Sequence, residues 1–221
     1  MKKISINFPV LDKKISFEDT NILVVESREL FSKLSQCLYM FDEQEYLKIF
    51  DESYKKLKSS NFLWISDIYS FDINSAQILK SIYASIEYNL NEKLDVKTRV
   101  EKLASEITNI LSYEFLEQDL DLEYDEITIL ELIKVLGVKV EVCTDSPLDR
   151  LFEIMKVYKF ISRKQLLIFQ NIGVYFSKKE IESILEYARL SNINLLVLEA
   201  RKLYDFKQYV LDEDYFLTLS E

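Results

Sequence analysis

The chain has 221 residues, of which 48% are hydrophobic, and its 28 basic and 38 acidic side chains give a formal net charge of −10. This composition excludes an intrinsically disordered chain, and the length predicts one large or two small domains. The chain has no histidine, two cysteines and two glycines, which excludes histidine-dependent catalysis, four-cysteine metal cages and the glycine-rich loops that bind phosphates.

The first 70 residues contain short apolar runs rich in β-branched residues, which predict strands. One amphipathic segment, Ser27–Phe41, predicts a helix with Leu30, Leu34 and Leu38 on one face. The run Tyr46–Phe50 is ambiguous between strand and helix. The strands predicted here are Ile4–Phe8, Asn21–Val25 and Asn61–Ile65.

Residues 75–136 show helical periodicity and no strand pattern. The first predicted helix begins near Ser75, and the second begins at Asp95 and carries an apolar stripe from Val96 to Leu111. The third is predicted over 125–136 and ends at Gly137, because glycine readily adopts the left-handed conformation that terminates helices.

The C-terminal third alternates between strand and helix patterns. Ser146 before a proline, and Ser177 with Glu180, are typical starts of helices that run to about Phe160 and Leu190. The strands predicted here are Val138–Cys143, Leu166–Gln170, Leu195–Leu198 and Tyr215–Leu219. Near-continuous hydrophobic strands that alternate with helices predict an α/β fold with a mainly parallel sheet.

These patterns divide the chain into a discontinuous α/β domain, residues 1–70 and 138–221, and an inserted all-helical domain, residues 71–137. The charge supports this division, because residues 62–137 hold fifteen acids and six bases, which is nearly the whole negative excess. The α/β part is close to neutral and has room for a local basic surface.

The sequence also predicts a cytoplasmic location. No apolar run approaches the about 20 residues that span a membrane, and the N-terminus lacks the apolar core of a signal peptide. The two cysteines indicate no disulfide framework. We therefore expect no membrane partner.

The most distinctive motif is the acidic stretch Glu117–Glu131, in which seven of fifteen residues are acids and none is basic. If it is extended, its two leucines point inward and three carboxylates share the other side. If it is helical, Asp119, Glu123 and Glu126 share a face. Such crowded oxygen ligands suit Ca²⁺ or Mg²⁺, although a solvated hinge that caps the next helix is the alternative. Position 124 is tyrosine where an EF-hand loop needs glycine, so the stretch is not an EF-hand.

Basic residues gather locally around Lys55, Lys56 and Lys58, with Lys48 upstream, and Lys134 and Lys139 flank Gly137. Such local density can bind phosphates, but an ordinary solvated face explains it equally.

Three acids, Glu26, Asp67 and Glu199, follow or end predicted strands. Open α/β sheets place active sites at this edge, so a metal-dependent nuclease is one hypothesis. Helix caps and loop residues are the alternative interpretation of these acids.

Several motifs closely resemble the Csn-two family of CRISPR-associated adaptation proteins from type II-A loci. The resemblance spans almost the whole chain in order, and the acidic stretch is its most specific part. The matching segments are Asn7–Asp12, Phe71–Ala76, Asn91–Lys93, Leu120–Lys134, Gly137–Glu141 and Tyr204–Phe216.

The resemblance implies an α/β head related to P-loop NTPases without a working nucleotide site, and a helical leg inserted in that head. It implies a homotetrameric ring that calcium stabilises, that threads linear double-stranded DNA from free ends, and that has no catalytic activity. The implied role is spacer acquisition, alongside the integrase pair and the guide-RNA nuclease of the same locus.

Carried over residue by residue, the resemblance implies two sets of site residues. The expected calcium ligands are Asp119, Asp121, Glu123, Asp125, Glu126 and Glu131, and the expected DNA-binding residues are Lys48, Lys56, Lys58, Lys134 and Lys139. Two alternatives remain beside this hypothesis: the metal-dependent nuclease, and a scaffold for the adaptation proteins that does not bind DNA.

Overall fold

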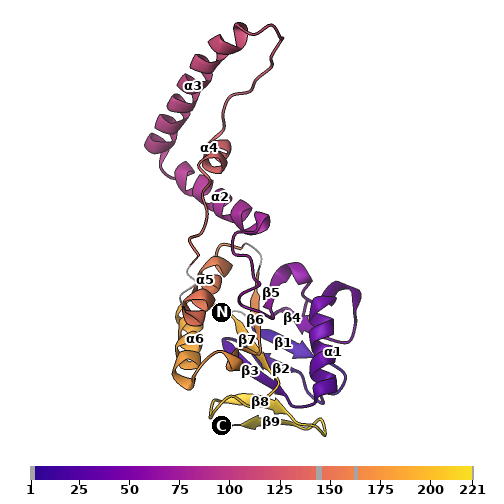
Figure 1. Ribbon diagram of the computed structural model, residues 1–221. Helices are drawn as coiled ribbons and strands as arrows, with labels where there is room; N and C mark the ends of the chain where they lie inside the picture. The colour runs from indigo at the N-terminus through magenta and orange to yellow at the C-terminus, as the bar shows by residue number, and fades with distance from the viewer. Residues whose placement is uncertain (1–2, 143–145, 162–163, 221) are drawn as a thin grey trace. The chain divides into compact units, whose positions relative to one another are not determined.

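The computed structural model describes residues 3–142, 146–161 and 164–220 (Figure 1). Two compact units make up the chain. The head unit is Met1–Asp72 together with Val142–Glu221, and the helical unit is Ile73–Glu141.

The head unit is built on a six-stranded sheet with the strand order β5-β6-β7-β3-β8-β9. All neighbouring pairs are parallel except β8 with β9, which is antiparallel. The mainly parallel sheet predicted from the sequence is therefore confirmed. The strands are β3 (Thr20–Val25), β5 (Phe62–Ile65), β6 (Leu166–Gln170), β7 (Leu195–Glu199), β8 (Gln208–Leu211) and β9 (Leu217–Ser220).

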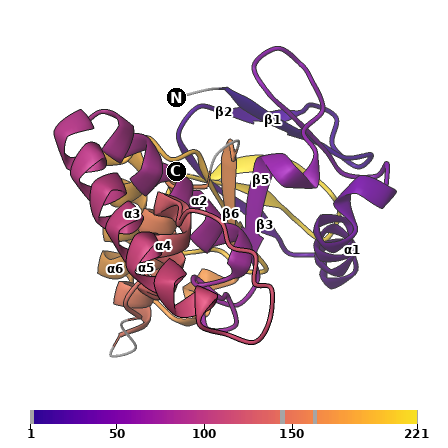
Figure 2. The same ribbon diagram turned by 90° about the horizontal axis from the view of Figure 1, so that it is seen from above.

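Helices cover both faces of this sheet, which explains its continuously apolar strands. Helix α1 (Arg28–Tyr39) lies on one side, and α5 (Pro147–Tyr158) and α6 (Lys178–Leu190) lie on the other (Figure 2). The predicted helix starts are confirmed. Ser146 accepts hydrogen bonds from the first turn of α5, and Ser177 forms a capping box with Glu180 at α6.

A second, antiparallel sheet has the order β2-β1-β4 and packs into the same hydrophobic core as α1. Its strands are β1 (Ile4–Asn7), β2 (Ile15–Phe17) and β4 (Lys48–Phe50). The ambiguous run at 46–50 is thus a strand over its last three residues. Two 3-10 turns, Phe41–Glu43 and Ser59–Asn61, flank β4, and a third, Ile172–Val174, follows β6.

Four sequence expectations about strands need correction. The predicted strand Val138–Cys143 is wrong over 138–142, where no strand forms, and Cys143 lies outside the described residues. Strands β2 and β8 were not expected, because each is only three or four residues long. β9 begins two residues after the predicted start, because Tyr215 has φ 66° in the turn before it.

The helical unit contains α2 (Ala76–Asn91), α3 (Leu94–Leu116) and α4 (Ile129–Val135). The third predicted helix starts four residues later than expected, because Thr128 and Glu131 form the capping box that begins α4. Gly137 adopts φ 64°, which confirms it as the left-handed stop after this helix.

The apolar stripe of α3 is exposed within the chain. Ile110 is 67% exposed and Leu103 51%, whereas the buried residues of this helix are Ala104 and Thr108. The stripe predicted from the sequence therefore forms, but it does not pack into the core of the described chain. Contiguous exposed apolar surface commonly marks a contact with another protein.

The Asn74 side chain explains why residues 138–142 need no strand partner. Its amide nitrogen donates to the Val140 carbonyl at 3.0 Å, and the Val140 amide donates to its oxygen at 2.9 Å. Tyr83 also donates its hydroxyl to the Val138 carbonyl at 2.9 Å. Side chains thus satisfy the backbone groups that a neighbouring strand would otherwise pair.

We predict that Asn74→Ala lowers the free energy of unfolding of the chain by about 2 kcal/mol, because two part-buried peptide groups of Val140 lose their partner. Chemical denaturation followed by circular dichroism measures the change. The matched control is Asn89→Ala at an exposed position of α2, which we expect to change stability by less than about 0.5 kcal/mol. Equal effects of the two substitutions would contradict the prediction.

Candidate nucleic-acid interface and acidic segment

Three of the five expected DNA-binding lysines lie on one hairpin, residues 48–58, which we call the lysine hairpin. Strand β4 forms its first arm, and the return arm is fixed by the bridge between Phe50 and Lys56 and by the Leu57 amide, which donates to the Ile49 carbonyl at 2.8 Å. Side chains alternate across a strand. Ile49 and Leu57 are therefore buried in the core, and Lys48, Lys56 and Lys58 face outward.

The turn of the lysine hairpin is built by Asp51 and Tyr54. The Asp51 carboxylate accepts hydrogen bonds from the Ser53 and Lys55 amides, both at 2.9 Å, and Tyr54 adopts φ 59°. The Lys14 ammonium lies 4.0 Å from the centre of the Tyr54 ring. These local contacts hold the two arms in register, so the lysines keep a fixed spacing.

Glu45 is a functional residue that the sequence analysis missed. Its carboxylate pairs with Lys56 at 2.9 Å and with Lys48 at 3.6 Å, and these two lysines hold the pKa of Glu45 below its ordinary value. The spacing of three residues between Glu45 and Lys48 was the available signal. Exposed ion pairs of this kind contribute little stability, so a phosphate can displace Glu45 at small cost.

The other two lysines, Lys134 and Lys139, belong to the helical unit. Lys134 lies in the last turn of α4, and Lys139 follows the left-handed residue Gly137. Both side chains are exposed.

The acidic segment, residues 117–128, forms the connection between α3 and α4 and is neither extended strand nor helix. All six expected calcium ligands are exposed. Leu120 and Leu122 are also exposed, so the expectation that they point inward is wrong. Phe115 and Tyr124 make a ring contact at 5.3 Å between centroids, which ties the segment to the end of α3.

Within one chain the acids do not form a cation site. Over the ranges that the structure describes, no three histidine, cysteine, aspartate or glutamate side chains are grouped closely enough to hold a metal ion. Glu131 is committed to Thr128, whose amide and hydroxyl donate to its carboxylate at 2.8 and 2.7 Å and lower its pKa. Glu126 lines a cavity of about 560 Å³ that Lys97 and Lys102 also line.

The three strand-end acids of the nuclease hypothesis lie apart. Glu26 follows β3, Glu199 ends β7 and Asp67 lies beyond β5, and β6 and β7 separate β5 from β3 in the sheet. At about 4.8 Å per strand, Asp67 is too far from Glu26 to share one metal ion. Glu26 is also paired with Lys202 at 3.6 Å.

Glu199 is the most unusual ionisable group of the head unit, because it is only 4% exposed. Burial raises its pKa to about 7, and hydrogen bonds from the Gly173 and Ile172 amides oppose this shift. The Gly173 amide donates to its Oε1 at 3.0 Å. A Cβ on Gly173 would collide with Leu203 and crowd Glu199, so glycine permits this close approach of the backbone.

Comparison with known proteins decides the family. The model of the CRISPR-associated protein Csn2 family matches residues 40–215. The chain belongs to the Csn2 family. It is 48% identical to CRISPR-associated protein Csn2 of Streptococcus agalactiae over 97% of both chains, and 38% identical to that of Enterococcus faecalis over 96% of this chain and 97% of the relative. The resemblance inferred from the sequence motifs is confirmed.

A solved structure supports the α/β architecture of this Csn2 family member. Stu0660 of Streptococcus thermophilus superimposes with a TM-score of 0.57 and 14% identity, over 100% of this chain and 76% of that chain. At this identity the likeness concerns the fold alone.

Membership in the Csn2 family makes this a CRISPR-associated protein and gives no enzymatic activity. In the part of the chain that the structure describes, no helix is both long and apolar enough to cross a membrane.

Proposed function

We propose that this protein acts in spacer acquisition as a non-catalytic, homotetrameric ring that binds the ends of linear double-stranded DNA without sequence specificity. The lysine hairpin is the observation that carries the proposal, because it presents three outward-facing cations at fixed spacing from a head unit whose described residues contain no gathered catalytic acids. Its partners would be the integrase pair and the guide-RNA nuclease of the same locus, in the cytoplasm.

The exposed apolar stripe of α3 supports self-association. Leu103, Ile107, Ile110 and Leu111 are each more than 40% exposed and share one helix face. A second copy that covered this face would remove apolar surface from water, which is the main favourable term in association. Closed symmetric assemblies of identical chains are the common outcome of such contacts.

An assembly also explains how a chain with net charge −10 binds DNA. Each copy adds its own lysine hairpin, and affinity for a duplex rises with the number of phosphates neutralised. Phosphate contacts carry no sequence information. A ring around the duplex would admit free ends and reject closed circles.

Calcium is part of the proposal, although the acids of one chain do not form a site for it. The acidic segment must close around the ion, or a second copy must supply further ligands. Either change would relieve repulsion among exposed carboxylates, which oxygen-preferring cations such as Ca²⁺ bind well.

The test of the proposed function is a gel shift of linear and closed-circular duplex DNA, each with calcium or with a chelator, followed by removal of protein. We expect calcium-dependent retardation of intact linear DNA and no retardation of circles. Shortened DNA after protein removal would favour a nuclease. Intact, unshifted DNA of both forms would favour a scaffold that does not bind DNA.

The acidic segment can be tested by Glu123→Gln combined with Glu126→Gln. We predict that this double variant weakens the calcium-dependent tetramer, because the segment loses two of its negative charges and with them affinity for the cation. Sedimentation velocity with and without calcium measures the tetramer, and metal analysis measures the bound ion.

The matched control for this pair is Glu182→Gln with Glu186→Gln, two exposed acids on α6. We expect the control to keep the tetramer and its calcium content. Unchanged mass and metal content in the Glu123 and Glu126 variant would remove the acidic segment from the proposal.

A further inference from the structure

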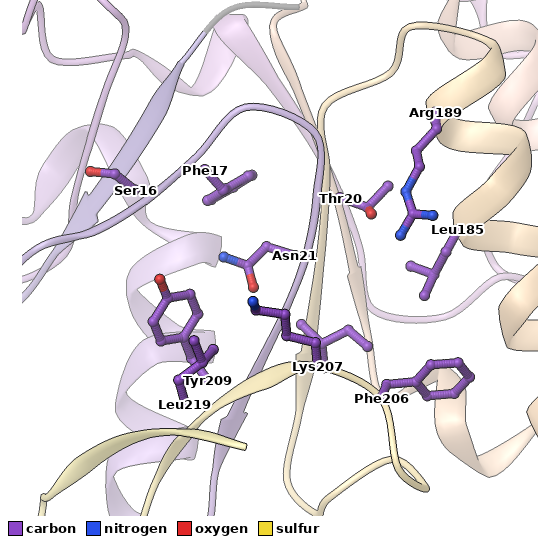
Figure 3. A pocket seen from close by; sticks show the side chains of 11 residues that line it. Ser16, Phe17, Thr20, Asn21, Leu185, Arg189, Phe206, Lys207, Tyr209 and Leu219 are labelled. Carbon is purple, nitrogen blue, oxygen red and sulfur yellow. The ribbon is translucent and has the colours of Figure 1, made fainter. Parts of the chain in front are cut away.

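A pocket of about 240 Å³ opens at the edge of the sheet opposite to Glu26 and Glu199. It lies where β3 begins at Thr20, between the end of β2, the last turns of α6 and the loop before β8. Phe17, Phe206 and Tyr209 contribute aromatic walls (Figure 3). The volume is several times that of one water molecule but below that of drug-sized sites, so it suits a small ligand.

Asn21 is the observation that points to a ligand. Its side chain is 8% exposed and lines the pocket. Its backbone belongs to β3, where it is paired with Leu196 of β7, and among the described residues its side-chain amide has no hydrogen-bond partner. A buried amide without a partner costs stability, so a strand in the centre of the sheet favours an apolar residue here unless the amide binds something.

Two cations lie beside this amide. Arg189 comes from the C-terminal end of α6 and Lys207 from the loop before β8. Asp19 pairs with the Arg189 Nε at 3.2 Å, which fixes the guanidinium while its terminal nitrogens point toward the pocket (Figure 3). The polar ends of Asn21 and Lys207 are directed into the same space (Figure 3). Among the residues that line the pocket, none is acidic.

We propose that this pocket binds a small organic anion, with its phosphate or carboxylate on Arg189 and Lys207 and a further polar atom on Asn21. Fixed guanidinium and ammonium groups favour anionic oxygens, and the aromatic walls favour an apolar body on the same molecule. This site is separate from the proposed DNA contacts, because none of its lining residues belongs to the lysine hairpin.

The experiment is a nuclear magnetic resonance titration of the ¹⁵N-labelled full chain with phenyl phosphate, benzoate, inorganic phosphate and phenol. We expect the Asn21 side-chain amide to shift with phenyl phosphate or benzoate at concentrations below about 10 mM. The stronger of the two identifies the preferred anionic group. Inorganic phosphate should bind more weakly because it lacks the apolar body, and phenol should not bind because it lacks the charge.

Substitution separates this pocket from general charge attraction. Both cations are exposed, so Arg189→Gln with Lys207→Gln should fold normally, and we expect it to weaken the binding of phenyl phosphate at least about tenfold. The control is Lys179→Gln, an exposed lysine at the start of α6, which should leave binding unchanged. An unperturbed Asn21 amide in the wild-type chain with all four probes, or shifts confined to the lysine hairpin, would overturn the proposal.

Discussion

Replacing Lys48, Lys56 and Lys58 together with glutamine is expected to weaken binding to linear duplex DNA by about a hundredfold or more at physiological salt. Each lysine that binds a phosphate releases counterions from the duplex, and every copy in an assembly would neutralise three fewer phosphates. The plot of log affinity against log salt should also become less steep, by about 0.9 for each phosphate that is no longer neutralised.

The substitution Glu45→Gln should act in the opposite direction. It removes the carboxylate that pairs with Lys48 and Lys56, so both ammonium groups become available to phosphates without first breaking an ion pair. We expect affinity to rise several-fold, and the gain should shrink as salt increases. Fluorescence anisotropy of an end-labelled duplex over a range of salt concentrations measures both variants.

The control for charge alone is the triple variant Lys3→Gln, Lys80→Gln and Lys179→Gln, which changes the net charge equally at exposed positions elsewhere. We expect it to lower affinity only slightly. If both triple variants bound DNA equally, the lysine hairpin would have no specific role and binding would follow net charge.

The elements that the sequence predicted best are those in which local pattern and burial agree. Strands β6 and β7 are continuous apolar runs, and burial on both faces of a parallel sheet requires that pattern. The starts of α5 and α6 depend on side chains within the first turn, so they can be inferred without knowledge of the tertiary fold.

The errors occur where distant residues determine the backbone. The apolar run at 138–142 has the composition of a strand, but Asn74 supplies its hydrogen bonds from 66 residues earlier. The stripe of α3 has the composition of a buried face, yet the chain itself does not cover it. Periodicity reports which residues need burial, and it does not report whether the same chain provides it.

The candidate sites show the same limit. Lysine content near residue 55 was visible in the sequence, but the outward direction of Lys48, Lys56 and Lys58 depends on the register of the hairpin. The pocket around Asn21 joins residues separated by almost 200 positions, and no local motif marks it. The strand-end acids were correctly placed on their elements, whereas the strand order that separates Asp67 from Glu26 comes only from the topology.

Glu199→Gln is expected to stabilise the protein at pH 8 and to have little effect at pH 5. Burial raises the pKa of Glu199 to about 7, compared with 4.5 for the unperturbed group. The folded state therefore holds a proton that the unfolded state releases between these pH values, so this carboxyl makes stability fall as pH rises from about 4.5 to above 7. A shift of this size corresponds to about 3 kcal/mol in full.

Glutamine is neutral at every pH and keeps a carbonyl oxygen for the Gly173 amide, which now donates to Glu199 at 3.0 Å. At pH 8 we therefore expect the variant to unfold at a temperature higher by about 6–12 °C, and at pH 5 the two proteins should differ by much less. Differential scanning calorimetry at both pH values gives the comparison. Because other acids also titrate over this range, the informative quantity is the difference between variant and wild type at each pH.

The exposed residue Glu186 on α6 provides the control. Glu186→Gln should leave the difference from wild type independent of pH, because an exposed carboxyl titrates similarly in the folded and unfolded states. If Glu199→Gln also gave the same difference at pH 5 and pH 8, Glu199 would already be ionised in the folded head unit at pH 5. The Gly173 and Ile172 amides would then outweigh burial, and the carboxyl edge of the sheet would hold a permanent negative charge beneath Arg201 and Lys202, the exposed cations that line the cavity above it.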